Sequence, residues 1–401
     1  MKQAGGTMKA LENLKVLDFT TLLPGPYATL MLADLGADVL KISSPSKPDI
    51  VLEYAPFIEG TDLAANEVWL GRGKRNMFLN LKNPDAIEIV KKLVKEYDIV
   101  VEQFRPGIME RLGLGYEALK KENPALIYCS LTGYGQTGPL AKAAGHDCNY
   151  MARSGNLAMA GYKDAGPAPM NIQVADICSG SSNVVISILA AVNYRNMTGK
   201  GQYIDVAMMD GLVPLTGMDG IRYLASGEES GRESRRLNGG SLYGYYETAD
   251  GEYLSVGSLE PKFWSAFCTG IGCPDLIEGT AEPAPEEFEA VRARIRGILK
   301  TKTRDQWVDV FKPLDCCVEP VLSLKEALDE DEQIKDRGLV VEVEVPCSGG
   351  KRVRQLGSPF KLSESPMTYE MGGYPLGYHT KEVIDELGLD YEQLKDGGTF
   401  R

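Results

Sequence analysis

The sequence predicts an α/β fold with a parallel sheet, from its length and from the order of its apolar patterns. From Leu14 onward, short runs of β-branched and aliphatic residues alternate with amphipathic stretches of helical spacing. This alternation is typical of βαβ units. The chain has 401 residues, 43% of them hydrophobic and 25% charged, which is an ordinary globular balance. At about 100 to 200 residues per domain, we expect two or three domains.

About the first 140 residues are expected to form a doubly wound sheet. Strands are predicted at 14–20, 38–42, 77–81, 98–104 and 125–131. Helices are predicted at 27–35, after the proline-containing break at 24–26, and at 85–97. Gly36 suits the left-handed residue that closes many helices, so the first helix should stop there.

Residues 175–196 form a long helical stretch of small and aliphatic side chains, closed by the Thr-Gly-Lys-Gly run at 198–201. The stretch is apolar almost all round. Such a helix is normally covered on every side. We therefore expect it to be buried in its domain or at a subunit contact.

Beyond about residue 221 the pattern predicts a smaller α+β domain. Residues 242–248 and 252–258 have the pattern of a hairpin, with an Asp-Gly turn between them. Helices are predicted at 263–271 and 288–311 on either side of an acidic, proline-bearing run. After about residue 330, a strand at 339–345 and a helix at 380–387 follow.

The charge balance excludes several partners. With 43 Lys and Arg against 56 Asp and Glu, the formal net charge is −13. The overall field of such a chain repels nucleic acid and anionic membranes, because phosphate binding depends on clustered basic residues. Any anionic ligand therefore requires a local basic pocket. His146 and His379 are the only histidines, so we expect no multi-histidine metal site.

The cysteine pattern and the N-terminus predict a cytoplasmic protein. None of the eight cysteines forms a Cys-x-x-Cys pair, and we expect them to be reduced thiols. Residues 1–10 lack the apolar core of a signal peptide. No segment reaches about 18 uninterrupted apolar residues, so no membrane span is expected.

A glycine motif at 133–138 matches the G-x-G-x-x-G pattern of dinucleotide sites. Such a site needs its third glycine to lead directly into a helix and an acidic residue at the end of the next strand. Here Pro139 follows the motif, and no strand leads into Asp164. We therefore expect a tight turn after a strand, without nicotinamide.

Three acids and one histidine lie at predicted element boundaries, where loops often carry function. His146 and Asp147 precede a helical run, Asp176 opens the long apolar helix, and Glu260 stands between a strand and a helix that starts with proline. Asp147 and Asp176 are alternatively simple N-caps, and His146 a surface residue.

Two basic clusters adjoin predicted strands. Arg72, Lys74 and Arg75 precede one strand, and Arg105 follows another at its carboxyl end, where open α/β sheets bind ligands. These side chains could hold a phosphate-bearing ligand against the negative net charge. The alternative is ordinary solvated surface charge.

Together these segments resemble the family III CoA-transferase superfamily (CaiB/BaiF type), which contains both CoA-transferases and 2-methylacyl-CoA racemases. The resemblance runs over nearly the whole chain, through segments 14–18, 24–26, 34–39, 72–75, 105–107, 110–115, 133–139, 198–202 and 377–380. It implies an interlocked homodimer. In each chain, 1–220 and 331–401 would form a large Rossmann-like domain and 221–330 a small α+β domain.

Within the superfamily, the chain is most similar to the racemases, because it has Gly-His-Asp at 145–147, Ala-Asp at 175–176 and Glu-Pro-x-Phe at 260–263. The resemblance implies that His146 and Asp176 are two bases on opposite faces of the carbon next to a thioester. Glu260 would orient His146, and a backbone N–H beside Asp147 would stabilise the enolate. Histidine suits the exchange of a proton near neutral pH.

The resemblance also implies that Arg72, Lys74, Arg75 and Arg105 hold the nucleotide and phosphates of coenzyme A, which is part of the substrate and not a resident cofactor. Ser43 and Ser44 stand where many racemases have a basic residue. The main alternative is a CoA-transferase in which Asp147 is the nucleophile. A non-catalytic acyl-CoA-binding protein is a third hypothesis. The sequence does not identify the acyl group, the chain that supplies Glu260, or a role for His379.

Overall fold

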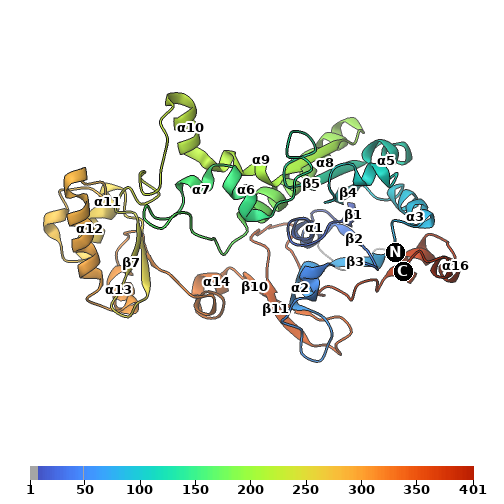
Figure 1. Ribbon diagram of the computed structural model, residues 1–401. Coiled ribbons are helices and arrows are strands. Elements are labelled where there is room, and N and C mark those ends of the chain that lie inside the picture. Colours follow the sequence, from blue (N-terminus) through green and yellow to red (C-terminus); the bar gives the residue numbers. More distant parts are fainter. Residues whose placement is uncertain (1–7, 48) are drawn as a thin grey trace. The chain divides into compact units, whose positions relative to one another are not determined.

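The computed structural model describes residues 8–47 and 49–401 (Figure 1). The chain divides into two compact units. The first contains the described residues up to Ser154, together with Asn171–Pro214 and Gln333–Arg401, and the second contains Gly155–Met170 and Leu215–Glu332.

The first unit contains a six-stranded parallel sheet in the order β3-β2-β1-β4-β5-β6. Its strands are β1 (Lys15–Phe19), β2 (Asp38–Ser43), β3 (Lys74–Phe78), β4 (Ile99–Glu102), β5 (Ile127–Thr132) and β6 (Tyr203–Ala207). This is the doubly wound order, which reverses between β1 and β4 and leaves a crevice at the carboxyl ends of these strands. The predicted α/β fold class is therefore confirmed.

Several predicted boundaries in the first unit are wrong by about three residues, among them both ends of β3, the start of α1 and the end of α3. Strand β3 begins at Lys74, three residues before the predicted start at 77. Its two basic residues do not resemble a buried strand, but Lys74 finds an acidic partner inside the unit, Asp18. The first helix begins at Pro24 rather than after residue 26, because a proline in the first turn lacks only an N–H that the helix does not use.

The first unit also contains helices. In chain order they are α1 (Pro24–Asp34), α2 (Ala65–Leu70), α3 (Pro84–Val94), α4 (Ile108–Arg111), α5 (Tyr116–Glu122), α6 (Asp147–Arg153), α8 (Ser182–Thr198), α9 (Met208–Leu212), α14 (Glu332–Asp336), α15 (Thr380–Glu386) and α16 (Tyr391–Asp396). Short 3-10 turns lie at Ile50–Glu53 (η1) and Pro214–Thr216 (η3). An antiparallel pair, β10 (Val340–Glu344) and β11 (Arg352–Leu356), precedes the C-terminal helices.

The long apolar helix is not buried all round within one chain. It starts as a π-helical segment, η2 (Val174–Ser181), and continues as α8. Four residues of α8 are buried, whereas Ile186 and Met197 are 63% and 70% exposed. Within the described residues, Val174–Thr198 is the one helix long and apolar enough to cross a membrane, and 44% of its most apolar window is buried. The core helix of a soluble protein has the same properties.

The second unit is built on the antiparallel sheet β7-β8-β9, with β7 (Gly244–Glu247), β8 (Tyr253–Val256) and β9 (Val318–Pro320). The predicted hairpin is thus present. Its helices and turns are α7 (Asn156–Met159), α10 (Gly217–Ser226), α11 (Pro261–Gly270), η4 (Pro274–Leu276), α12 (Pro285–Leu299), α13 (Arg304–Phe311) and η5 (Glu326–Glu330). The helix predicted at 288–311 is divided because Thr303 starts a new one, accepting a hydrogen bond from Gln306 N.

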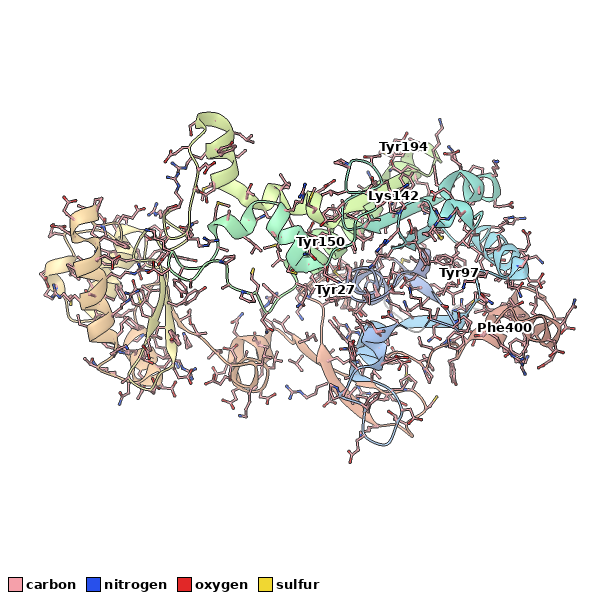
Figure 2. The ribbon with its side chains drawn as sticks, in the orientation of Figure 1. Tyr27, Tyr97, Lys142, Tyr150, Tyr194 and Phe400 are labelled. Carbon is pink, nitrogen blue, oxygen red and sulfur yellow. The ribbon has the colours of Figure 1, made fainter. Side chains whose placement is uncertain are left out.

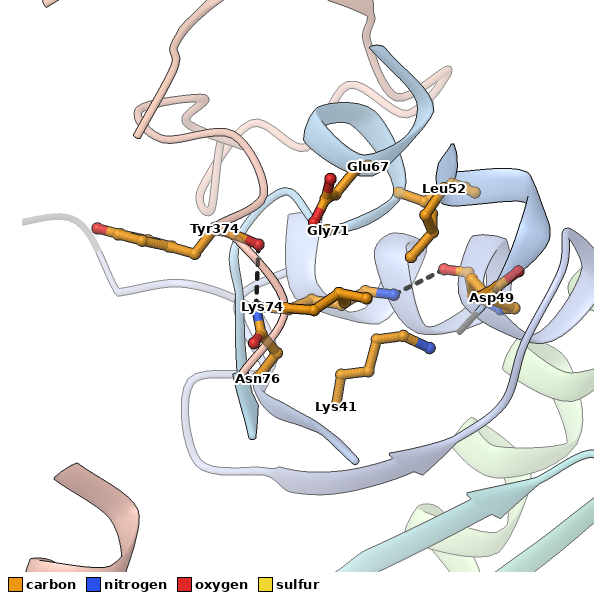
Figure 3. Close-up of a pocket in the computed structure, with 11 residues that line it drawn as sticks. Lys41, Asp49, Leu52, Glu67, Gly71, Lys74, Asn76 and Tyr374 are labelled. Atoms are coloured by element: carbon orange, nitrogen blue, oxygen red, sulfur yellow. Dashed lines mark hydrogen bonds between the residues drawn. The ribbon is translucent and has the colours of Figure 1, made fainter. Parts of the chain in front are cut away.

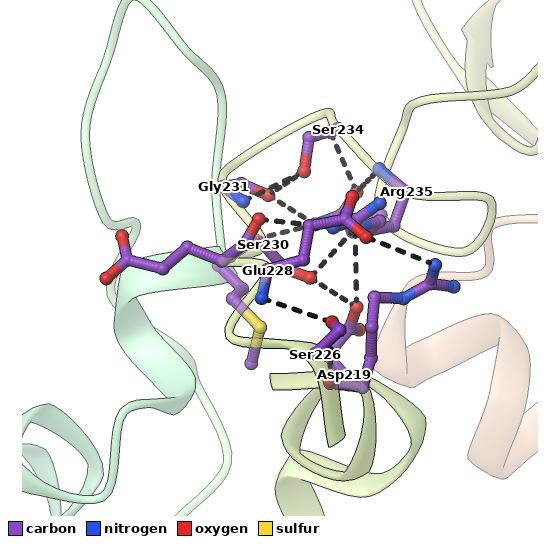
Figure 4. Close-up of polar contacts among 11 residues, drawn as sticks. Asp219, Ser226, Glu228, Ser230, Gly231, Ser234 and Arg235 are labelled. Atoms are coloured by element: carbon purple, nitrogen blue, oxygen red, sulfur yellow. Dashed lines mark hydrogen bonds and ion pairs between the residues drawn. The ribbon is translucent and has the colours of Figure 1, made fainter. Parts of the chain in front are cut away.

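Residues 155–170 belong to the second unit, although the predicted large domain included them. The reason is the loop after α10, which folds around Arg235 (Figure 4). The Arg235 guanidinium donates to Ser230 Oγ and to Glu228 Oε1, both at 2.8 Å. From the same loop, Arg232 Nε donates to Ala160 O at 2.8 Å. This loop therefore holds the 155–170 segment in the second unit.

The C-terminal segment covers the outer edge of β3. Asn76 N donates to His379 Nδ1 at 3.2 Å, and His379 N donates to Asn76 O at 3.0 Å. Phe78 N donates to Thr380 Oγ1 at 3.0 Å. An uncovered sheet edge would leave these backbone groups unpaired. His379, for which the sequence suggested no role, is thus part of the structure of the sheet.

We predict that His379 makes the stability of the first unit depend on pH. Burial lowers the pKa of His379 below 6.5. Because the unfolded chain binds the proton more readily, the contribution of His379 is complete above about pH 6.5 and is lost as the pH falls below it. Urea unfolding between pH 5 and 7.5 measures this slope. His379→Gln, which keeps an acceptor but does not titrate, should flatten it, and an unchanged slope in that variant would contradict the assignment.

Candidate active site

The start of α6 carries two of the predicted site residues. His146 is the N-cap, with extended backbone, and Asp147 is the first helical residue. His146 N donates to Asn149 Oδ1 at 3.0 Å, and Asn149 N donates to His146 O at 2.8 Å. The expectation that Asp147 is the N-cap is therefore wrong by one residue, and its carboxylate is available for another contact.

The Asp147 carboxylate binds the start of η2. Its Oδ1 accepts hydrogen bonds from Ala175 N at 2.6 Å and from Asp176 N at 3.1 Å. The first N–H groups of a helix have no partner within it, so these bonds satisfy donors that would otherwise be unpaired. The N-cap of η2 is Gln173, and Asp176 is not a cap. The bonds bring His146, Asp147 and Asp176 into one small region of the first unit.

The half-buried Asp176 carboxyl titrates close to neutral pH. Burial raises its pKa to about 6, the negative charge of Asp147 adds to this effect, and His146 opposes it. The residue lies in a π-helical segment, a feature that is frequent at functional sites. A carboxyl group with such a pKa can both accept and deliver a proton near neutral pH.

The glycine motif at 133–138 lets the backbone approach α6 closely. A Cβ at Gly133 would collide with the hydroxyl of Tyr150, which lies on α6 (Figure 2) and donates to Gly145 O at 2.6 Å. Burial raises the pKa of Tyr150 to about 12, and the positive charge of Arg105 opposes the shift. Arg105 is therefore within electrostatic reach of the same region. The motif serves close packing, and no helix starts at Gly138.

A family model for CoA-transferase family III matches residues 11–380. The chain belongs to this family. It is 33% identical to human alpha-methylacyl-CoA racemase over 388 residues, which is 96% of the chain and 95% of the relative. It is equally 33% identical to a succinyl-CoA:mesaconate CoA-transferase of Haloarcula marismortui over 393 residues, 96% of the chain and 98% of the relative.

The fold agrees with that of solved structures. A crystal structure of a CAIB/BAIF family protein from Brucella suis is similar with a TM-score of 0.82 at 30% identity, covering 94% of the chain and 99% of that protein. The CaiB/BaiF resemblance expected from the sequence is therefore confirmed. Because the relatives include racemases and CoA-transferases at similar identity, membership of the family leaves both activities open.

Two of the four residues predicted to bind phosphate make hydrogen bonds and ion pairs inside this family III chain. Arg72, which is 3% exposed, donates to both carboxylate oxygens of Asp34, at 3.0 and 2.7 Å. Lys74 Nζ donates to Pro26 O and to Thr29 Oγ1 at 2.8 and 2.7 Å, and burial lowers its pKa to about 8. Both charges thus have partners inside the unit.

Arg75 and Arg105 differ from each other in whether the guanidinium group has partners within the protein. Arg75 contacts three carboxylates at 2.9 to 3.5 Å, those of Asp38, Glu382 and Glu386. Arg105 is exposed, and its guanidinium has no hydrogen bond or ion pair with any described residue. Of the four predicted basic residues, Arg105 is therefore the one whose charge is free for a phosphate.

A small pocket lies beside β2 and β3 (Figure 3). Lys41, Asp49, Glu67 and Lys74 line it, and burial raises the pKa of Glu67 to about 7. It has room for about one water molecule, too little for an acyl-CoA. Lys41 Nζ donates to Thr20 O at 2.6 Å, and Asp49 Oδ2 accepts from Leu22 N at 2.8 Å. These two residues, which the sequence did not single out, hold the loop after β1.

Glu260 belongs to the second unit. It is the N-cap of α11, with extended backbone, and Pro261 takes the first helical position as predicted. The carboxylate is exposed and makes no capping hydrogen bond. Its negative charge therefore remains available to another group.

We predict that Arg72→Ala strongly destabilises the first unit. The substitution leaves the Asp34 carboxylate, 7% exposed, without its partner. Removing one member of a buried ion pair typically costs about 3 to 5 kcal/mol. Guanidinium unfolding measures the loss. Arg294→Ala, which breaks an exposed pair with Asp275, should cost at most about 1 kcal/mol. Equal losses of unfolding free energy in the two variants would show that the buried Arg72–Asp34 pair stabilises the unit no more than an exposed pair does.

Proposed function

We propose that this family III protein is a 2-methylacyl-CoA racemase, which inverts the carbon next to the thioester by two-base proton transfer. The observation that carries the proposal is that the hydrogen bonds of Asp147 hold Asp176 next to the start of α6, where His146 is the N-cap. Burial also raises the pKa of the Asp176 carboxyl to about 6. Racemisation needs an acid and a base that exchange roles. A carboxyl group with a raised pKa and an imidazole side chain are suited to this exchange.

In the proposed mechanism, one base removes the α-proton and the other returns a proton to the opposite face. For one epimer, neutral His146 abstracts and protonated Asp176 delivers. For the other epimer, the Asp176 carboxylate abstracts and the His146 imidazolium delivers. After one inversion each group holds the protonation state that the reverse reaction needs, so the cycle balances without an external acid or base.

The enolate between these steps carries negative charge on the thioester oxygen. The first backbone N–H groups of α6, at Asp147 and Cys148, have no partner within the helix. They also lie at the positive end of its dipole. A donor of this kind typically contributes about 3 to 4 kcal/mol to stabilising an oxyanion. We assign the stabilisation of the enolate to this helix start.

The remaining roles follow from the resemblance. We propose that Glu260 orients the His146 imidazole, the usual function of a carboxylate behind a catalytic histidine, and that Arg105 binds a phosphate of coenzyme A. The exposed apolar residues of α8, including Ile186 and Met197, support an interlocked homodimer as the working form. We place the enzyme in the cytoplasm, acting on a soluble acyl-CoA and without a resident cofactor.

A CoA-transferase is the second candidate. The Asp147 Oδ1 atom accepts two backbone hydrogen bonds, whereas no described residue binds Oδ2. That oxygen is free to attack an acyl-CoA and to form an acyl anhydride with release of the CoA thiolate. The similarity to the Haloarcula transferase favours this alternative to the same degree as the human relative favours a racemase.

The deciding experiment is incubation of one 2-methylacyl-CoA epimer with the enzyme in heavy water, using several acyl chains. A racemase introduces one α-deuterium and forms the other epimer. We predict that His146→Ala and Asp176→Ala lower both rates about 10²- to 10⁴-fold, the range expected for loss of a general acid or base. Asp164→Asn, an exposed acid, is the matched control. Mass spectrometry of an acyl adduct on Asp147, with no deuterium uptake, would establish the transferase instead.

We predict that Arg105→Ala raises KM for the CoA ester about 10- to 100-fold with little change in kcat. A charge-assisted hydrogen bond contributes about 1.5 to 3 kcal/mol. The same variant should leave the matching pantetheine ester unaffected, since that substrate lacks the nucleotide phosphates. Steady-state kinetics on both esters measure the difference. A comparable loss on the two substrates would show that Arg105 does not bind phosphate.

A further inference from the structure

We propose that the Asp147 carboxylate is a positioning residue, a clamp that holds the start of η2 against the start of α6 and thereby keeps the two bases in register. The inference rests on the proposed racemase function and concerns how the two bases of that site are positioned. It assigns to the Asp147 side chain a role different from that of the backbone N–H at the same residue and different from a nucleophile.

The hydrogen bonds of the Asp147 carboxylate connect the two segments that carry the proposed bases. One oxygen, Oδ1, accepts from Ala175 N at 2.6 Å and from Asp176 N at 3.1 Å. Asp176 is thus both a base and a donor to the clamp, and His146 is the residue directly before Asp147. Each base therefore lies within one residue of the two hydrogen bonds.

The covalent chain between the two bases does not by itself fix their relative position. Asp147 and Asp176 are 29 residues apart, and 155–170 between them belongs to the second unit. Side-chain bonds fix η2 on its other sides, because Ser179 Oγ donates to Met208 O and Ser181 Oγ donates to Pro24 O, at 2.5 and 2.6 Å. With η2 held in this way, the Asp147 bonds set where α6 stands relative to it.

The clamp also carries a charge. The negative charge of Asp147 adds to the burial that raises the pKa of Asp176, and removing it should lower that pKa. Other titratable or charged groups lie on the elements packed against η2 or on η2 itself: His146, Cys148, Tyr150 and Arg153 on the α6 side, Tyr27 and Asp34 on α1, Tyr194 and Arg195 on α8, Asp210 on α9, Tyr203 and Asp205 on β6, and Cys178 on η2. Among them His146 acts on Asp176, and in the opposite direction.

The clamp and the charge can be separated by two substitutions. Asp147→Asn keeps an acceptor oxygen for the two N–H groups but removes the charge and the nucleophile. Asp147→Ala removes the acceptor as well. If Asp147 acts as a clamp, only its acceptor oxygen is needed for activity. If it is a nucleophile, the carboxylate is needed. If it only caps η2 and does not position the bases, the substitutions should change stability alone.

The test compares α-deuterium exchange by the full-length wild type and these two variants from pH 5 to 8. We expect Asp147→Asn to retain at least about tenfold more of the wild-type kcat than Asp147→Ala. In the direction in which Asp176 abstracts the proton, the acid limb of its profile should move to lower pH. Asp147→Ala should lose at least about 50-fold in kcat with KM nearly unchanged. Far-UV circular dichroism and thermal unfolding show whether each variant is folded.

Loss of exchange in Asp147→Asn to the level of Asp147→Ala would overturn the clamp. A second measurement tests the effect of the Asp147 charge on Asp176 by itself. Carbon-13 NMR titration of the Asp176 carboxyl, assigned with Asp176→Asn, needs no activity and should show a lower pKa in Asp147→Asn than in the wild type. A wild type without exchange would refute the racemase. With an active wild type, loss of exchange in Asp147→Asn to the level of Asp147→Ala would refute the clamp, and an unchanged Asp176 titration would refute the effect of the Asp147 charge.

Discussion

The buried carboxylate of Asp18, at the carboxyl half of the central strand β1, is the constraint on which the first unit depends. It is fully buried and accepts from Thr20 N and from Thr29 Oγ1, at 2.8 and 2.5 Å. Burial alone would raise its pKa, but the charges of Lys41 and Lys74 keep the pKa below its usual value. Because an uncompensated buried charge is very costly, the β1 end, β2, β3 and α1 assemble together around this group.

This arrangement determines where the candidate active site stands. Asp18 and the two lysines fix the loop after β1 and the first turn of α1. In the first turn of α1, Pro24 O accepts a hydrogen bond from the Ser181 hydroxyl, which holds η2 against α1. Asp176 lies on η2. The basic residues near β3 thus act as internal supports. Arg105, at the end of β4 on the other side of the strand-order reversal, keeps a free charge.

Much of the fold and part of the site could be predicted from the sequence. The parallel strands and the hairpin have strong local patterns, and His146, Asp147 and Asp176 stood out by residue type and position. Lys41 and Asp49 were missed because nothing in the local pattern distinguishes a buried lysine or a loop aspartate from a solvated one. The start of β3 at Lys74 was missed for the same reason, since its acidic partner is 56 positions away.

The sequence by itself determined the fold class, the family resemblance and the list of residues that can move protons, because these depend on local periodicity and on residue chemistry. Only the tertiary structure decided which charges are available. It paired Arg72 with Asp34, left the Arg105 guanidinium without a partner among the described residues, and turned the Asp147 carboxylate toward the backbone of Asp176. The physical reason is that pairing and desolvation depend on neighbours far apart in the chain, and composition does not record them.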